Sequence, residues 1–413
     1  MRLGWVDFSD DERNKVMDVI RQLTQPGAVD ELGIGVIRDA FSDYFFPGTS
    51  TIQTRAKYFL VVPYIMKELG DNSANSTVPQ LINELQKKEK ECARKLIQNS
   101  SYNENGIIGR DTLPNWVVRS PSDIYWNGIR TFRIFYPQNM SIREYFALAI
   151  SRSLDRKSKG YDKTKNSKTN EYNKRSDDAD DDWDDSDAGY RNGLFHWDLN
   201  EVYDPKWFND VSIKLTSDEA NYLKKKILDS QAGTLLAYAF SDGFDATKYD
   251  DFESFTAALQ EEVSLPEELV ETIKLANDFN RFLLLARTRY NIIYANYENK
   301  EWDKKWQEQA KRLKRNCAVD LLRIYSKFSI KNSGLKKFLL RLQKAFLEND
   351  IKRADRLIIN QEKDIKTKAR AKLLSDINSR EKKWIGGEYL DYRFRYARDI
   401  ISDIKMAEGK KNA

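Results

Sequence analysis

The strongest constraint on the fold is a helical spacing of apolar residues that recurs through most of the chain. Ile34, Ile37 and Phe41 follow one another at intervals of three or four residues, and the same spacing returns over residues 335–346 and 390–404. Residues that break helices are scarce: the 413 residues include only 18 glycines and 9 prolines. The sequence therefore predicts a mainly α fold.

The composition changes abruptly between residues 155 and 190. Lysine and serine come first, and eight of the eleven residues 177–187 are aspartate. Such a segment cannot bury enough apolar surface to offset its conformational entropy, so we expect a disordered linker, first basic and then acidic. An alternative is that its acidic part mimics nucleic-acid phosphate or covers the basic C-terminal region. The linker predicts an N-terminal helical lobe at 1–154 and a basic C-terminal helical lobe at 191–413.

Local signals place individual elements in the first lobe. A capping box opens at Ser9, Thr49-Ser50-Thr51 predicts the start of another helix, and residues 78–98 predict a further one. The short strands that the sequence favours lie at 107–108 and 116–118. Together with the helix that follows, they suggest a small winged-helix-like element near residues 107–135.

The inventory of reactive side chains argues against an enzyme. With His196 as the single histidine, and Cys92 and Cys317 as the two cysteines, neither a multi-histidine metal site nor a disulfide framework can form. No phosphate-binding loop, nucleophile elbow or C-x-x-C motif is present. We expect no cofactor and no catalytic residue, and we expect His196 to be a packed aromatic with a satisfied nitrogen. An enzyme with an unrecognised site is the alternative.

Neither a signal peptide nor a membrane span is expected. Acidic residues follow the first six positions, and the longest apolar stretch, residues 58–66, is far shorter than the ~20 residues that cross a bilayer. We expect a soluble, cytoplasmic protein.

Charge is distributed unevenly along the chain. From Lys300 to the end there are 31 Lys and Arg against 16 Asp and Glu, whereas residues 1–299 hold 38 against 48. A C-terminal region with a net charge of +15 suggests a polyanionic partner such as nucleic acid. The alternative is a set of solvated helices whose lysines only keep the protein in solution.

Three stretches are candidate nucleic-acid contacts, and the first follows Pro47. Gly48, Thr49 and Ser50 at a helix start offer backbone N–H groups to an anion, with Arg55 one turn further on. The alternative is ordinary capping, in which Ser50 and Gln53 form a capping box.

The second candidate is the helix start after Arg119. Its Ser-Pro-Ser-Asp sequence resembles the entry to the second helix of a helix-turn-helix, where N-terminal residues face bases and arginines hold phosphate. Arg119, Ser122, Tyr125 and Arg130 would form that surface. Many helix starts share this pattern without binding DNA.

The third candidate is the run of alternating arginines and aromatics near the C-terminus. Arg393, Arg395 and Arg398 among tyrosines and a phenylalanine fit stacking and phosphate pairing with a single strand. Ion pairs at a spacing of four residues, such as Asp391 with Arg395, are the alternative use of these arginines.

Several stretches resemble an uncharacterised bacterial family of unknown function. They are Leu3–Phe8, Asp30–Gly35 with Arg38-Asp39, the Phe46–Tyr64 run that begins FPGTSTIQTRAKYF, the PSxIYW motif at 121–126, Leu215-Thr216, and LDYR at 390–393.

The resemblance implies a component of a mobile anti-phage defence locus, beside helicases or nucleases, and it names no catalytic residue. We therefore expect a non-enzymatic protein that binds nucleic acid or docks on a helicase or nuclease partner. A protein–protein adaptor without nucleic-acid contact is the alternative.

Overall fold

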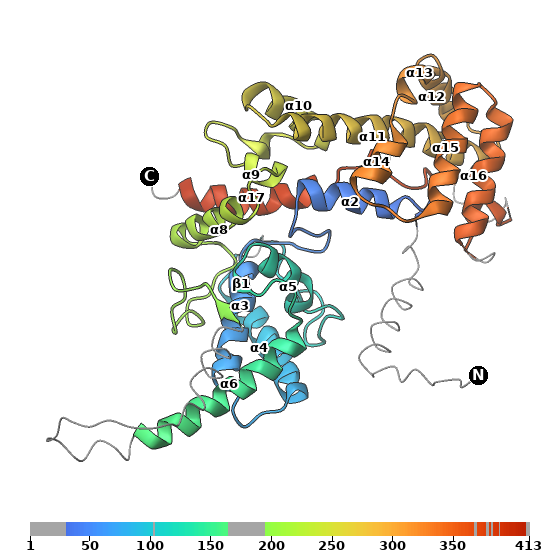
Figure 1. Ribbon diagram of the computed structural model, residues 1–413. Coiled ribbons are helices and arrows are strands. Elements are labelled where there is room, and N and C mark those ends of the chain that lie inside the picture. The colour runs from blue at the N-terminus through green and yellow to red at the C-terminus, as the bar shows by residue number, and fades with distance from the viewer. Residues whose placement is uncertain are drawn as a thin grey trace, which may run out of the picture. The chain divides into compact units, whose positions relative to one another are not determined.

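The computed structural model describes residues 30–101, 104–163, 195–366, 370–376, 380, 383–387 and 389–409, and for residues 156–163 it describes the backbone alone. The described chain is mainly helical, as predicted (Figure 1). Its strands are β1 (Phe135–Tyr136) and β2 (His196–Trp197), which pair antiparallel with Phe135 opposite Trp197. The helix predicted from Ser9 lies outside the described residues.

The described chain divides into two compact units, and each combines segments far apart in sequence. Unit 1 contains residues 30–42 and 265–392, and unit 2 contains 43–264 and 393–409. The boundary falls inside α2 (Gly35–Phe45). This division differs from the continuous lobes expected on either side of the linker, since β1 before the linker pairs with β2 after it within unit 2.

The predicted linker begins inside a helix. Helix α6 (Ile142–Lys163) continues past residue 155, because extending an existing helix adds one hydrogen bond for each residue ordered. The remainder of the predicted linker, residues 164–190, lies outside the described residues.

Unit 1 is organised around one long helix, α11 (Glu267–Tyr294). This 28-residue helix buries side chains on nearly all sides, which is typical of a helix at the centre of a bundle. Helices α15 (Ser333–Leu347) and α16 (Ile351–Ile365) form a helical hairpin that breaks at Asn349 (φ 54°) and restarts with Asp350 as N-cap. The other helices are α12 (Lys300–Ala310), α13 (Leu313–Asn316), α14 (Leu321–Lys327) and the short 3-10 helix η2 (Lys372–Leu374).

Unit 2 is organised around α3 (Tyr58–Asp71), which is buried along most of its length and packs against α4, α5 and α6. The C-terminal helix α17 packs against α8. The remaining helices are α4 (Val78–Gln98), α5 (Pro121–Thr131), α8 (Ser217–Ser230), α9 (Leu235–Tyr238), η1 (Ala246–Lys248), α10 (Phe252–Glu262) and α17 (Phe394–Glu408).

Two local predictions are wrong. The helix expected after Thr49-Ser50-Thr51 begins only at Tyr58, because the preceding residues form turns. The strands expected at 107–108 and 116–118 are turns and irregular chain, so the winged-helix-like element has no wing there. Positive φ angles at Gly106 (86°) and Gly109 (91°) are incompatible with an extended strand.

Candidate nucleic-acid interface

The Pro-Gly turn before α3 is packed tightly inside unit 2. Gly48 has a left-handed φ of 76°, and a Cβ atom there would lie 2.7 Å from a ring carbon of Phe132. The buried Thr49 hydroxyl donates to a backbone carbonyl (2.6 Å). The Ser50 N–H donates to Gln53 Oε1 (3.1 Å), which is one of the two hydrogen bonds of a capping box. This hydrogen bond stabilises a turn, because no helix begins at these residues. These groups make contacts within the protein.

Arg55 is held by two carboxylates. Its guanidinium binds Asp403 of α17 (2.9 Å) and Glu104 (3.0 Å), and 16% of its side chain is exposed. Burial by itself lowers the pKa of Arg55, but hydrogen bonds and charge from Asp403 and Glu104 outweigh burial and raise it. A phosphate group would have to displace one of these carboxylates.

Tyr125 lies in the core beneath the same segment. Its fully buried hydroxyl accepts hydrogen bonds from the N–H groups of Thr54 (2.8 Å) and Arg55 (3.0 Å) and donates to the Arg55 carbonyl (2.9 Å). The Tyr125 side chain therefore fixes the backbone around Arg55 instead of facing solvent.

Ser122 is buried where α5 meets α4. The helix expected after Arg119 forms, and a capping box opens α5, with Ser120 as N-cap and Asp123 as its partner. The N–H of Ser122 donates to Glu89 Oε1 (2.6 Å), so a carboxyl group of α4 already occupies the N-terminus of α5. Glu89 is one of three glutamates on α4, and nothing in the sequence distinguishes it.

The arginines around α5 differ in exposure. Arg119 is exposed on the loop before the helix. Arg130 donates to the Met140 carbonyl (3.1 Å) and lies over the ring of Trp126, and burial lowers its pKa.

The arginines near the start of α17 also have acidic neighbours. Arg393 contacts Asp43 and donates to a backbone carbonyl (3.1 Å), and Arg398 binds Asp250 (2.7 Å). Arg395 is exposed. Of the eleven predicted contact residues, Arg119 and Arg395 are the exposed ones, and all eleven stay predictions as nucleic-acid contacts.

A different part of the basic C-terminal region has exposed cations without carboxylate partners. Residues 311–344 contain eleven Lys and Arg and one acidic residue, Asp320, whose carboxylate caps α14. We call seven exposed members the basic face: Lys311, Arg312, Lys314, Arg315, Lys337, Arg341 and Lys344. Within the part of the chain that the structure describes, the side chains of these residues have no hydrogen bond or ion pair except Lys344, which lies 3.7 Å from Glu348.

Packing brings the two parts of the basic face together. The Gln343 amide of α15 donates to the carbonyls of Cys317 (2.9 Å) and Val319 (2.7 Å), which holds the chain after α13 against α15. On α15 the basic residues follow at positions 337, 341 and 344, so they lie along one exposed side of the helix. Helix α16, beside α15 in the hairpin, carries exposed Lys352, Arg356 and Lys363.

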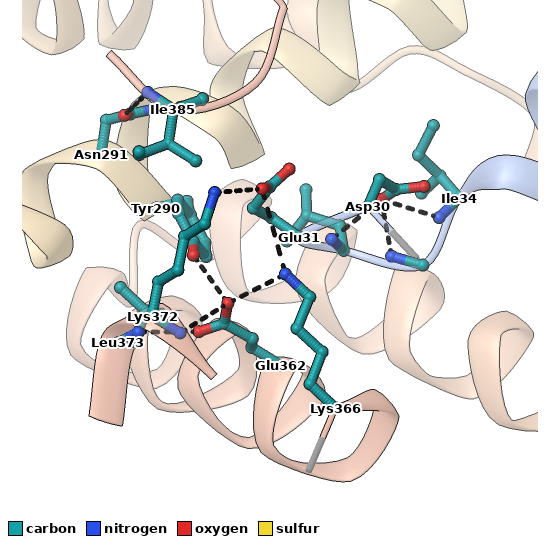
Figure 2. Close-up of polar contacts among 12 residues, drawn as sticks. Asp30, Glu31, Ile34, Tyr290, Asn291, Glu362, Lys366, Lys372, Leu373 and Ile385 are labelled. Atoms are coloured by element: carbon teal, nitrogen blue, oxygen red, sulfur yellow. Dashed lines mark hydrogen bonds and ion pairs between the residues drawn. The ribbon is translucent and has the colours of Figure 1, made fainter. Parts of the chain in front are cut away.

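The buried side of α16 is anchored by the polar cluster of Figure 2. Glu362 is fully buried and accepts hydrogen bonds from the Tyr290 hydroxyl (2.7 Å) and from Lys366 (3.2 Å). The neighbouring Glu31 binds Lys372 (3.1 Å). Burial by itself would raise the pKa of Glu31, but the hydrogen bond from Lys372 and the charges of Lys366 and Lys372 outweigh burial and lower the pKa. The cluster, with the fully buried Glu362 at its centre, holds α16 in place within unit 1.

The Asp30 carboxylate stabilises the turn formed by the Asp30–Gly35 stretch. Its carboxylate accepts hydrogen bonds from the N–H groups of Leu32 (2.9 Å), Gly33 (2.7 Å) and Ile34 (3.2 Å), just before α2 (Figure 2). Gly33 has a φ of 72°, which such a turn requires and which glycine adopts without strain. The stretch is a structural turn.

Neither His196 nor the cysteines form a reactive centre. His196 is exposed and stacks on Tyr136 with ring centres 4.6 Å apart. Its ring nitrogens have no hydrogen-bond partner within the described residues, and the expected satisfied nitrogen stays a prediction. Cys92 and Cys317 are buried thiols, and burial raises the pKa of each to about 12. In the described ranges, no three His, Cys, Asp or Glu side chains converge as metal ligands.

Comparison with known proteins shows a similarity over the N-terminal part of the chain. Residues 1–148 match the model of a family of unknown function (DUF6361). Neither the curated proteins nor the solved structures include a match to the chain. Across the described ranges, the helices are all too short or too polar to cross a membrane.

Proposed function

We propose that the protein binds nucleic acid through the basic face of unit 1. The observation that carries the proposal is the cluster of exposed Lys and Arg on α15 and around α13, of which only Lys344 has a carboxylate partner among the described residues. Concentrated positive charge of this kind attracts phosphates and releases their counter-ions on binding.

The basic face is a better candidate than the arginines of unit 2 because fewer existing ion pairs have to break when a phosphate binds. A phosphate that approaches Arg55 must break its ion pairs with Asp403 and Glu104. At Lys337 and Arg341 no such pair has to break, and a polyanion relieves repulsion between neighbouring cations.

A charge-neutral variant of α15 tests the proposal. We expect Lys337→Gln, Arg341→Gln and Lys344→Gln together to weaken duplex DNA binding and to reduce the log–log salt slope by about 2–3. The measurement is fluorescence anisotropy over a salt series. The fold should survive, because all three side chains are exposed.

The matched control removes three exposed charges from another helix. Lys87, Lys88 and Arg94 lie on α4 and are exposed. Replacing them by glutamine makes the same change in net charge, so affinity and slope should stay close to wild type. Equal losses in both variants would mean that net charge, and no particular surface, governs binding.

An acidic protein partner is the alternative for the same surface. It predicts no DNA or RNA binding at low salt, together with binding to an acidic polypeptide that the α15 variant loses. A role in anti-phage defence and a helicase or nuclease partner stay predictions that rest on the resemblance alone.

A further inference from the structure

We propose that the basic face takes double-stranded nucleic acid, held by its phosphates, in preference to single strands. This inference rests on the proposed nucleic-acid function and adds the class of ligand.

The first support is the lack of a stacking surface. Proteins that hold single strands stack successive bases on exposed aromatic rings. Residues 311–366, all described, contain four aromatic side chains. Tyr325, Phe338 and Phe346 are buried, and Phe328 is half-buried. The basic residues therefore alternate with apolar side chains that face the core, and not with rings that face solvent.

One exposed aromatic lies close to the hairpin. Tyr297 is 52% exposed, and its hydroxyl hydrogen-bonds Asp355 of α16 (3.0 Å). The guanidinium of Arg289 binds the same carboxylate (2.6 Å) and lies 5.9 Å from the Tyr297 ring. A single ring committed to this ion pair cannot support a series of bases.

The second support is that the charges are fixed on a rigid element. Lys337, Arg341 and Lys344 span about 10 Å along α15 at 1.5 Å per residue. A duplex places roughly one charge every 1.7 Å of its axis, and it stays straight over a length far greater than this face. A flexible single strand has lower charge density and must be ordered on binding, which costs conformational entropy.

The experiment compares three probes of about 30 nucleotides per strand: duplex DNA, duplex RNA and single-stranded oligo-dT. We expect both duplexes to bind the full-length protein about ten-fold more tightly than oligo-dT near 0.1 M salt. The glutamine variant of α15 should lose this preference. Tyr297→Leu, which removes the ring and leaves Arg289 paired with Asp355, should keep it.

The outcomes separate this inference from the proposed function. Oligo-dT binding as tight as duplex binding, and still weakened by the α15 variant, would overturn the duplex preference and leave nucleic-acid binding intact. Loss of binding in Tyr297→Leu would also overturn it, because a stacking contact would then carry the affinity. If none of the three probes binds at low salt, both proposals fail. A difference between the duplexes would tell whether DNA or RNA is the ligand.

Discussion

Replacing Glu89 by glutamine should stabilise unit 2, and increasingly so as the pH rises. The carboxyl is 2% exposed, and its Oε2 is buried without a hydrogen-bond partner among the described residues. Burial raises the pKa of Glu89 from 4.5 to about 8, although the hydrogen bond from the Ser122 N–H favours the ionised form. The folded protein therefore holds a neutral acid at pH 7.

The magnitude follows from that shift. A folded-state pKa above the unfolded value means that the contribution of Glu89 to stability is complete below pH 4.5 and is lost as the pH rises through 8. At about 1.36 kcal/mol per pKa unit, the full loss is about 5 kcal/mol. Glutamine resembles the protonated acid, keeps an acceptor for Ser122 and does not titrate. The variant should thus differ from wild type by less than about 1 kcal/mol at pH 5 and by about 5 kcal/mol at pH 9.

Hydrogen exchange of α5 measures this difference locally, which matters because the chain has two compact units. Wild type and variant are compared at the same pH, so the intrinsic pH dependence of exchange cancels. Selective carbon labelling of glutamate should also show one carboxyl that titrates near pH 8 and is absent from the variant. A stability difference that stays constant from pH 5 to 9 would refute the reasoning.

Further perturbations address the core of unit 2 and the chain around the predicted linker. Gly48→Ala should destabilise the unit by about 1–3 kcal/mol in thermal unfolding, since its Cβ would meet a ring at 2.7 Å, whereas Gly233→Ala, also at positive φ but with open space, should cost about 1 kcal/mol or less. A double-mutant cycle of Arg55→Gln and Asp403→Asn should give a coupling of about 1–3 kcal/mol, and a value near zero would contradict the ion pair. Proteolytic cleavage within residues 164–194 should leave two fragments that co-elute in gel filtration, because β1 and β2 on either side pair in unit 2; separate elution would contradict that pairing.

The features that could be predicted from the sequence are those that depend on neighbours along the chain. Helix α4 spans residues 78–98 as predicted, and the helix expected after Arg119 begins at Pro121 with Ser120 as its cap. The apolar spacing over residues 335–346 also falls within α15. These features are set by helical spacing and by hydrogen bonds over three or four residues, so they can be read locally.

The start of α3 shows where local signals fail. Thr49-Ser50-Thr51 has the composition of a helix start, yet the helix begins at Tyr58. The intervening backbone is held by the Tyr125 hydroxyl, which is some 70 residues away in sequence. A side chain from another helix supplied the hydrogen bonds that a first helical turn would have used.

Which charged side chains have partners depends on how distant helices pack, and this could not be predicted from the sequence. Arg55 meets Asp403, 348 positions later, and the N-terminus of α5 meets Glu89 of another helix. The cations of residues 311–344 have one acidic neighbour in that stretch, Asp320. In the described part of the chain, packing pairs Arg323 with Glu271 and Lys327 with Glu268 but brings no carboxylate partner to Lys337 or Arg341. Composition gives only the number of charged residues. An ion pair needs the two charged groups within about 4 Å of each other, and helices far apart in sequence must pack together to bring them there.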